Sequence, residues 1–338
     1  MNVATPAESL HEVAQLATVE IHSPVRAKSV DFFTRVLGMY VAKTDSNSTY
    51  LRGYEDPYAY SLQITDGENA GPGVTGLRAN SPAALERRAK ALAEADLGDR
   101  WVEGEFGHGR AYHFHTPDGH KLKLFFDVDY ADVADADKTT LRNRPSKRPM
   151  QGIPVRRLDH INYLCSNVTA NKNALIENLG FKLSEHVVLD ADNELAAWLR
   201  VTNLVHDVAF MRDAAGEKGR LHHIAFWYGI PQHLMDVAEL CVQEGIQVEA
   251  GPGKHGISQA LFLYVIEPGG NRVELFGDAG YLIFDPTWKP VTWTGAEIET
   301  GIIWVGSKLP QDFFVYGTPI VEAAKTAEKS PAQEVEPV

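Results

Sequence analysis

The sequence predicts an α+β fold of two tandem domains, each a pair of βαβββ modules. The main observation is an internal repeat, in which a helical segment ends in a leucine followed by Gly38, and again in a leucine followed by Gly180. A chain reversal between two strand-like segments is also repeated, starting at Pro117 and at Pro268. Glycine after the last helical residue is typical of a left-handed C-cap, and a Pro-x-Gly sequence is typical of a turn between strands.

The predicted elements follow the same order in both copies. In the first copy they are a strand at Glu20-Ile21, a helix over 24–37, a strand over 75–79 and a helix over 82–95. In the second copy they are a strand at His160-Ile161, a helix over 168–179, a strand over 223–227 and a helix over 231–244. Aromatic and β-branched residues at 111–115 and 260–266 predict a further strand before each repeated turn. A strand, a helix and several strands therefore occur twice in each copy.

These boundaries divide the chain into five segments. We predict an N-terminal arm at 1–14, a first domain at 15–135, a linker at 136–155, a second domain at 156–305 and a C-terminal extension at 306–338. The linker is rich in prolines and basic residues. The extension ends in a segment rich in Ala, Lys, Glu and Pro, a composition that favours partial disorder.

The composition excludes several classes of protein. The 338 residues carry a formal net charge of -13, so the chain lacks the basic surface that nucleic-acid binding needs. A hydrophobic content of 44% is ordinary for a soluble domain, and no apolar run is long enough to span a membrane. Cys165 and Cys241 form no metal-binding or redox motif, and the N-terminal segment does not resemble a signal peptide. We therefore expect reduced thiols and a cytoplasmic protein.

Three polar residues in apolar strands of the second copy are candidate metal ligands. His160, His223 and Glu274 are each followed by an apolar residue, so each side chain points to the strand face opposite that neighbour. Two imidazoles and one carboxylate, with coordination positions left open, are the ligand set of non-haem Fe(II) oxygenases. His222 is an alternative second ligand, but His223 precedes Ile-Ala-Phe as His160 precedes Ile-Asn-Tyr. Taken singly, a strand histidine is more often a surface or core residue, and Glu274 would suit a solvent-exposed face.

The first copy provides an internal comparison for these ligands. The matching positions there are Glu20, Gly76 and Lys123. A lysine in its charged form cannot ligate a divalent cation. We therefore expect a metal in the second copy alone.

The second copy also carries a series of short motifs. They are Arg157-Leu158-Asp159-His160, Ala196-Ala197-Trp198, Val205-His206-Asp207, His222-His223-Ile224-Ala225-Phe226, Gly251-Pro252-Gly253-Lys254-His255-Gly256 and Asn271-Arg272-Val273-Glu274. With these motifs the stretch 157–276 resembles the type I extradiol dioxygenases of the vicinal oxygen chelate superfamily, in the branch of the catechol and homoprotocatechuate 2,3-dioxygenases. The first copy resembles the non-catalytic domain of that family more loosely.

The resemblance implies a fold, a reaction and a cofactor. The implied reaction is the ring cleavage of a catechol by O2 to a 2-hydroxymuconic semialdehyde-type product. His160, His223 and Glu274 of this sequence match the metal ligands of the family. The metal in that family is Fe(II) or Mn(II), and Fe(II) is the commoner. Family members are commonly homo-oligomers, and we expect a tetramer whose partners are a catechol-type molecule and O2.

The resemblance also implies roles for five residues around the metal. His206 matches an acid/base that handles protons beside the bound oxygen. His255 and Tyr264 match groups that form hydrogen bonds with the substrate and the intermediates. Asn162 and Trp198 match residues of the pocket wall. Each of them alone would be read as an ordinary strand, loop or core residue.

The substrate class follows from positions that differ from the homoprotocatechuate enzymes. Where those enzymes have arginines for a substrate carboxylate, the matching positions here are Ala250, Thr300 and Gly301. The nearby residues are apolar and comprise Trp288, Trp293, Ile302, Ile303 and Trp304. We therefore predict an uncharged catechol, either plain or carrying alkyl or halogen groups, with a biphenyl-type or homoprotocatechuate-type diol as the alternative.

Two other functions remain open from the sequence. One is a different metalloenzyme on the same scaffold, such as an isomerase or a glutathione-dependent lyase, which would draw its ligands from paired units. The other is a metal-free protein that binds a small aromatic molecule. A binding protein has no need of two histidines and a glutamate converging on one point, so the sequence favours the enzyme.

Overall fold

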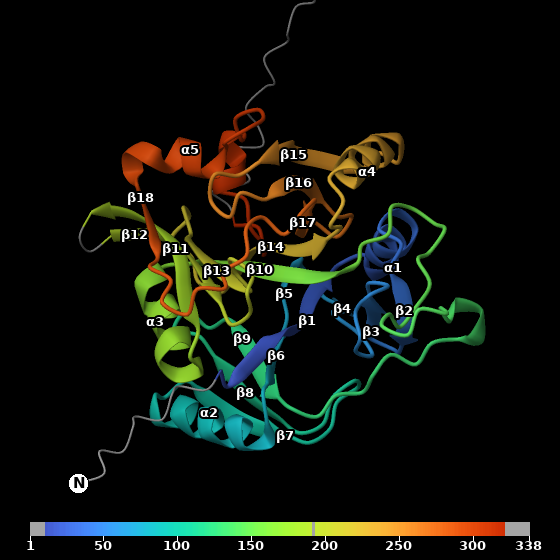
Figure 1. The fold of residues 1–338 in the computed structure, drawn as a ribbon, viewed down its shortest axis with the longest axis horizontal. Coiled ribbons are helices and arrows are strands. Elements are labelled where there is room, and N and C mark those ends of the chain that lie inside the picture. The colour runs from blue at the N-terminus through green and yellow to red at the C-terminus, as the bar shows by residue number, and fades with distance from the viewer. Residues whose placement is uncertain (1–10, 191–192, 322–338) are drawn as a thin grey trace, which may run out of the picture.

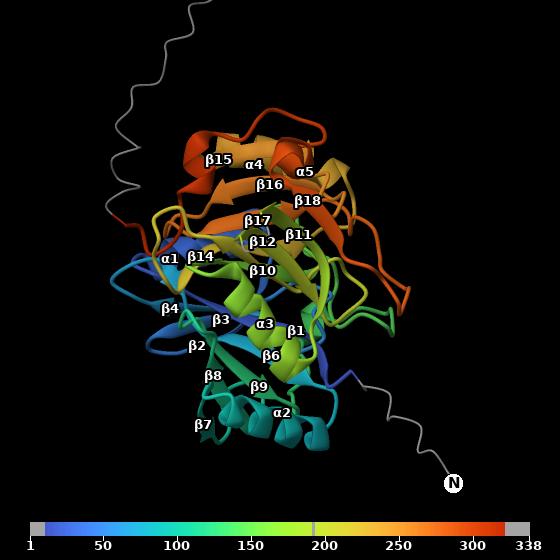
Figure 2. The ribbon, with the colours of Figure 1, turned by 90° about the vertical axis from the view of Figure 1, so that its left-hand side faces the viewer.

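The computed structural model describes residues 11–190 and 193–321. Within this part of the chain, two mixed sheets of nine strands each carry the fold, one from each half of the sequence. Figure 1 shows the arrangement, and in Figure 2 the strands of the second half lie above those of the first, with α2 at the bottom. The α+β class and the two repeated units predicted from the sequence are confirmed.

The first sheet has the strand order β2-β3-β4-β1-β6-β9-β8-β7, with β5 paired to β1. Its strands are β1 (Val13–Ser23), β2 (Tyr40–Thr44), β3 (Ser48–Arg52), β4 (Leu62–Asp66), β5 (Gly71–Pro72), β6 (Thr75–Ala79), β7 (Gly98–Val102), β8 (Ala111–His115) and β9 (Lys121–Phe125). The helical segments of this half are α1 (Arg26–Asp31), η1 (Phe32–Val36), α2 (Pro82–Glu94) and η2 (Asp135–Asp137). Because β1 runs parallel to β4 and β6 runs parallel to β9, each half of the sheet is one βαβββ module.

The second sheet has the order β15-β16-β17-β14-β10-β13-β12-β11-β18. Its strands are β10 (Arg157–Cys165), β11 (Lys182–Asp190), β12 (Asn193–Arg200), β13 (Val208–Arg212), β14 (Arg220–Trp227), β15 (Gln247–Lys254), β16 (Leu261–Ile266), β17 (Arg272–Phe276) and β18 (Val291–Thr294). The helical segments are α3 (Val168–Leu179), α4 (Gln232–Gln243), η3 (Gly295–Glu297), α5 (Ile298–Ile302) and η4 (Gln311–Phe314). The parallel pairs β10/β13 and β14/β17 repeat the module pattern of the first half.

The sequence explains where the main helices begin and end. The hydroxyl oxygen of Ser81 accepts a hydrogen bond from an amide in the first turn of α2, and the amide oxygen of Asn167 does the same for α3. Gly180 ends α3 with a φ of 76°, as the Leu-Gly pattern predicted. The segment expected as one helix over 24–37 is instead a short α-helix that continues as a π-helical turn.

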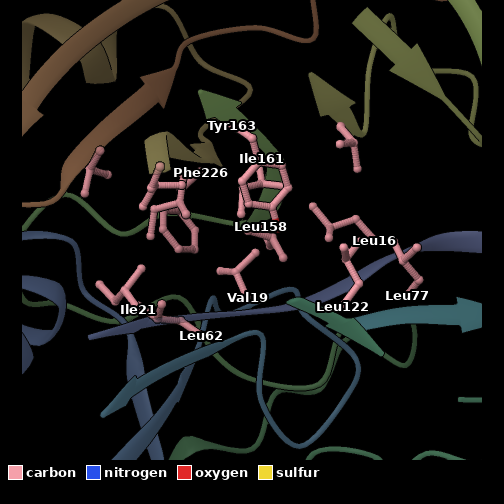
Figure 3. Close-up of a cluster of buried hydrophobic side chains, with 14 of the residues drawn as sticks. Leu16, Val19, Ile21, Leu62, Leu77, Leu122, Leu158, Ile161, Tyr163 and Phe226 are labelled. Carbon is pink, nitrogen blue, oxygen red and sulfur yellow. The ribbon is translucent and has the colours of Figure 1, made fainter. Parts of the chain in front are cut away.

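The hydrophobic core lies between the two sheets (Figure 3). Val19 and Ile21 of β1 face β10 and β14 of the other sheet, where Ile161 and Phe226 lie, and all four side chains are fully buried. One continuous core therefore holds both halves of the described chain in a fixed relation.

The two halves also hold each other through their repeated turns. Asp118, in the first turn, accepts hydrogen bonds from the amide and the hydroxyl of Ser166 just before α3. In the second turn, the side-chain amide of Asn271 donates to the carbonyl oxygen of His22 at 3.0 Å. Each turn thus supports the end of the first strand of the other half. Such reciprocal contacts are expected when two repeats are related by a pseudo-twofold axis.

Replacing Asp118 with alanine is expected to lower the free energy of unfolding by about 1–3 kcal/mol, because the partly buried amide and hydroxyl of Ser166 lose their acceptor. The decrease would be measured as a lower midpoint of thermal or denaturant unfolding. Asp99 is a suitable control, because its carboxylate is half exposed and pairs with an exposed arginine. Asp99→Ala is expected to change stability by less than about 0.5 kcal/mol, and equal midpoints for the two variants would contradict the prediction.

Part of the predicted C-terminal extension is ordered against the second sheet. Phe313 is buried, and Thr318 pairs with Leu221 on β14 through two backbone hydrogen bonds. The rest of the segment expected to be disordered, at 322–338, lies outside the described residues, as do residues 1–10 of the predicted arm. Within the described residues, no helix is long and apolar enough to cross a membrane.

Candidate metal centre and active site

The three predicted ligands lie on three neighbouring strands, and their donor atoms meet. His160 on β10, His223 on β14 and Glu274 on β17 are all buried. His160 Nε2 lies 3.1 Å from His223 Nε2 and 2.9 Å from Glu274 Oε2. His223 Nε2 lies 3.1 Å from the same carboxylate oxygen. One donor atom from each residue therefore lies within 4.8 Å of the other two.

The register of the sheet explains this convergence. Strand β14 lies between β10 and β17, and Ala225 is opposite both His160 and Glu274. The small methyl group of Ala225 leaves room for the two larger side chains to lean toward each other. His223 lies two residues before Ala225 on the same strand, so it points to the same face. Three residues far apart in the sequence thus share one side of the sheet.

This group of side chains fits a divalent cation. At these distances the lone pairs of two imidazole nitrogens and a carboxylate oxygen repel one another. A cation bound between the three atoms would offset that repulsion. Burial lowers the pKa of His223 to about 4, which keeps its ring neutral as metal binding requires. Two histidines and one carboxylate, with further positions left open, are typical of non-haem iron sites.

His206, the predicted acid/base, lies beside the three ligands. It is buried in the loop before β13, and its ring centroid is 4.0 Å from that of His160. Burial lowers the pKa of His206 well below its usual range. His206 is therefore neutral at pH 7 and is a proton acceptor before it is a donor.

His255 and Tyr264 form a hydrogen-bonded pair at the other side of the ligands. The Nδ1–H group of His255 donates to the carbonyl oxygen of Ile302 at 2.5 Å, so its Nε2 accepts from the hydroxyl of Tyr264 at 3.1 Å. Tyr264 lies opposite Glu274 in the sheet. Burial and the charge of Glu274 raise the pKa of Tyr264 well above its usual value, so the phenol keeps its proton.

All eight predicted site residues line one cavity of about 370 Å³. Asn162 and Trp198 lie on its wall, and the Oδ1 atom of Asn162 is buried without a hydrogen-bond partner among the described residues. The rest of the wall is mainly apolar and includes Val187, Leu195, Ala196, Met211, Ile257, Ile298 and Ile302. The cavity thus combines one polar end with an apolar body, which is typical of a site for a small aromatic ligand.

The cavity residues that sequence reasoning missed include two phenylalanines and one arginine. Phe313 and Phe314 reach the cavity from the segment that was expected to be a partly disordered extension. Arg212, at the end of β13, also lines the cavity, although its guanidinium group donates to the side chain of Asn193 and to the carbonyl oxygen of Glu194. A position at the end of a strand is a weak signal, because the sequence does not show which strand ends border a cavity.

The positions used to predict the substrate lie in different places. Gly301 and Ile302 line the cavity, whereas Thr300 lies on an adjoining groove that shares Ile302 with it. Ala250 is buried beside the cavity in a small cluster that includes Tyr264. Trp304 is 65% exposed and lies on the same groove as Thr300.

The structure corrects the residues that match the ligands in the first copy. Lys123 lies opposite Gly76 as Glu274 lies opposite Ala225, so Lys123 matches Glu274 as predicted. Since β1 places Thr18 opposite Gly76, the residue that matches His160 is Thr18 and not Glu20.

By the same register, Val74 and not Gly76 matches His223. A shift of two residues leaves every side chain on the same face, so the alternation in the sequence could not reveal the error. The ammonium group of Lys123 pairs with Glu105 at 2.9 Å.

Comparisons with known proteins agree with this fold and site. A model of the Glyoxalase/Bleomycin resistance protein/Dioxygenase superfamily matches residues 157–275. The chain is 51% identical over 314 residues to the metapyrocatechase of Geobacillus stearothermophilus, covering 93% of this chain and 96% of that protein. It is 35% identical over 302 residues to a manganese-dependent 2,3-dihydroxybiphenyl 1,2-dioxygenase of Geobacillus genomosp. 3, covering 88% and 95%.

Solved structures give the same result. The chain matches homoprotocatechuate 2,3-dioxygenase of Brevibacterium fuscum, in complex with 3,4-dihydroxyphenylacetate, with a TM-score of 0.79 and 25% identity over 90% of this chain and 92% of that one. The enzyme of Arthrobacter globiformis matches with a TM-score of 0.79 and 26% identity over 91% and 92%. The chain belongs to the Glyoxalase/Bleomycin resistance protein/Dioxygenase superfamily. Within it, the chain is a member of the extradiol ring-cleaving dioxygenases.

Proposed function

We propose that this protein cleaves the ring of an uncharged catechol with O2 at an Fe(II) ion held by His160, His223 and Glu274. The observation that carries the proposal is the meeting of these three donors at the polar end of an apolar cavity. A bound divalent iron or manganese ion would supply open positions for both catechol oxygens and O2, so that the reactants lie side by side.

His206 and Asn162 suit the proton chemistry of this reaction. A catechol hydroxyl that approaches the ligands comes close to the neutral ring of His206, which accepts its proton. The protonated ring then holds that proton near the reacting oxygen atoms and returns it as the ring opens. The unpartnered Oδ1 atom of Asn162 accepts a hydrogen bond from a substrate hydroxyl.

Tyr264 and His255 suit the binding of the substrate oxygen on the opposite side. Tyr264 keeps its proton, so its hydroxyl is a donor that turns from His255 toward a negatively charged oxygen. His255 is fixed by its bond to the carbonyl oxygen of Ile302. The pair therefore stabilises charge that develops on the substrate while the ring is attacked.

The apolar wall supports a substrate without a carboxylate. Burying an unpaired carboxylate costs several kcal/mol, and the one cationic side chain among the described wall residues, Arg212, already donates to Asn193 and Glu194. Ring substituents that are alkyl, halogen or aryl groups lose no hydrogen bonds when they enter this cavity. We accordingly place catechol and its alkyl and halogen derivatives ahead of carboxylated diols.

The test is turnover by anaerobically purified protein loaded with Fe(II) or Mn(II). On adding air, catechol and 4-methylcatechol are expected to give a yellow ring-fission product, with kcat/KM at least about tenfold higher than for 3,4-dihydroxyphenylacetate. If neither Fe(II) nor Mn(II) supports formation of the yellow product, the proposed function is overturned. A preference for the carboxylated diol would overturn the substrate class alone, and loss of that preference in Arg212→Leu would identify Arg212 as its cause.

The same preparation separates the two metals. The relative from Geobacillus genomosp. 3 is named manganese-dependent, and the ligand set accepts both ions. We propose Fe(II) as the native ion, and metal analysis after purification without added metal measures it. A homotetramer in the cytoplasm is also part of this proposal, and sedimentation velocity measures the oligomeric state.

A further inference from the structure

Two irregularities in the sheet lie at the two histidines of the proposed metal site. Between Leu158 and His160, strand β10 advances two residues while β14 advances one, so Asp159 is the extra residue of a β-bulge. Farther along the same strand pair the reverse occurs, and the extra residue is His222, next to His223. A bulge disturbs the alternation of a strand and redirects side chains. It therefore lets a residue contact its neighbour in the sequence, which regular alternation prevents.

The first bulge residue holds the first histidine. Asp159 Oδ2 accepts a hydrogen bond from His160 Nδ1 at 2.9 Å, and both side chains are buried. The other carboxylate oxygen of Asp159 lies 3.1 Å from the guanidinium group of Arg157. With Nδ1 protonated and held by a carboxylate, Nε2 of His160 is left with its lone pair facing His223 and Glu274.

The second bulge residue holds the second histidine. His222 Nδ1 lies 2.6 Å from His223 Nδ1, and His222 is buried. If His223 binds metal through Nε2, its Nδ1 carries the proton and donates it to the lone pair of His222 Nδ1. His222 is fixed in turn by its ring contact with Phe313, at 4.9 Å between centroids. His222, which the sequence left as an alternative second ligand, thus contacts the ligand His223.

The first copy keeps one of these bulges without its polar residue. Between Leu16 and Thr18, strand β1 has an extra residue relative to β6, and that residue is Ala17. In the register of the repeat, Thr18 matches His160, so Ala17 matches Asp159. The backbone irregularity is therefore a property of the repeated unit, whereas the carboxylate occurs only where a histidine must be held.

We propose that Asp159 and His222, as the extra residues of two β-bulges, are positioning residues that fix the ring orientation and tautomer of His160 and His223 for metal binding. This inference rests on the proposed metal site. The ligand His160 is supported by a carboxylate and His223 by a neutral imidazole.

The test measures metal affinity in folded protein. Asp159→Ala and His222→Leu are each expected to weaken the binding of Mn(II) alone, measured by anaerobic equilibrium dialysis, by about 10–100-fold. The absorption spectrum of the Co(II)-loaded variants is expected to change, because the ring orientation of a ligand changes. Asp159→Asn and His222→Asn retain an acceptor oxygen near the lost atom, and they are expected to recover part of the affinity.

Asp118→Ala is the matched control, because Asp118 is also a buried carboxylate that accepts hydrogen bonds from a neighbouring strand end, but it contacts none of the ligands. This variant is expected to lose stability and to keep the wild-type affinity for Mn(II). Wild-type affinity in both Asp159→Ala and His222→Leu would overturn the inference, as would equal losses in the alanine, leucine and asparagine variants. Failure of the wild-type protein to bind Mn(II), Fe(II) or Co(II) would instead overturn the proposed metal site.

Discussion

Replacing Glu274 with alanine is expected to abolish ring cleavage and metal binding together. Glu274 supplies the single anionic donor among the three residues, and its carboxylate oxygen lies about equally close to both imidazole nitrogens. A catalytic metal contributes several kcal/mol to transition-state stabilisation, so kcat/KM is expected to fall about a thousandfold or more. Metal analysis of the purified variant and the formation rate of the yellow product measure the two losses.

The control for this experiment is the matching position in the first copy. Lys123→Gln changes a buried charged residue at the equivalent place of β9, where Lys123 pairs with Glu105. Its metal content and kcat/KM are expected to stay within about twofold of the wild type, since the residue contacts none of the ligands. Full metal content and turnover in Glu274→Ala would remove the central argument for the site.

Replacing His206 with phenylalanine is expected to slow turnover by about 100- to 10,000-fold while metal and catechol still bind. Phenylalanine fills a similar volume in the buried loop but neither accepts nor donates a proton. His206 packs ring against ring on His160, at 4.0 Å between centroids, and a phenyl ring can retain this packing, so the three donors are expected to keep their positions. Single-turnover kinetics in air, after anaerobic binding of catechol, separates the chemical steps from binding.

An exposed histidine provides the comparison for His206. His115→Phe, at the exposed end of β8 in the first sheet, is expected to leave kcat unchanged. Turnover of His206→Phe at the wild-type rate would show that the proton is handled elsewhere. Loss of metal from His206→Phe would show instead that His206 holds the ligands in place.

The fold could be predicted because the sequence repeats itself. The Leu-Gly helix ends and the Pro-x-Gly turns mark the same unit twice, and local rules for capping and chain reversal apply wherever they occur. The three donors could also be found, because a polar residue isolated in an apolar strand stands out against the alternation. His222 and His223 show the limit of this reasoning, because two successive histidines interrupt the alternation and the choice of His223 depended on comparing its neighbours with those of His160.

What the sequence by itself determined is therefore the repeated α+β unit, the residue types of the site and the half of the chain that carries them. The tertiary structure decided the rest. It set the register in which Thr18 of the first copy occupies the position of His160 in the second. It also formed the bulges that turn Asp159 and His222 toward the ligands, and it brought Phe313 to the cavity wall. The physical reason is that hydrophobic alternation has a period of two and is blind to a shift of two residues in that register. Bulges and distant segments are fixed by hydrogen bonds and packing between strands, which no local pattern contains.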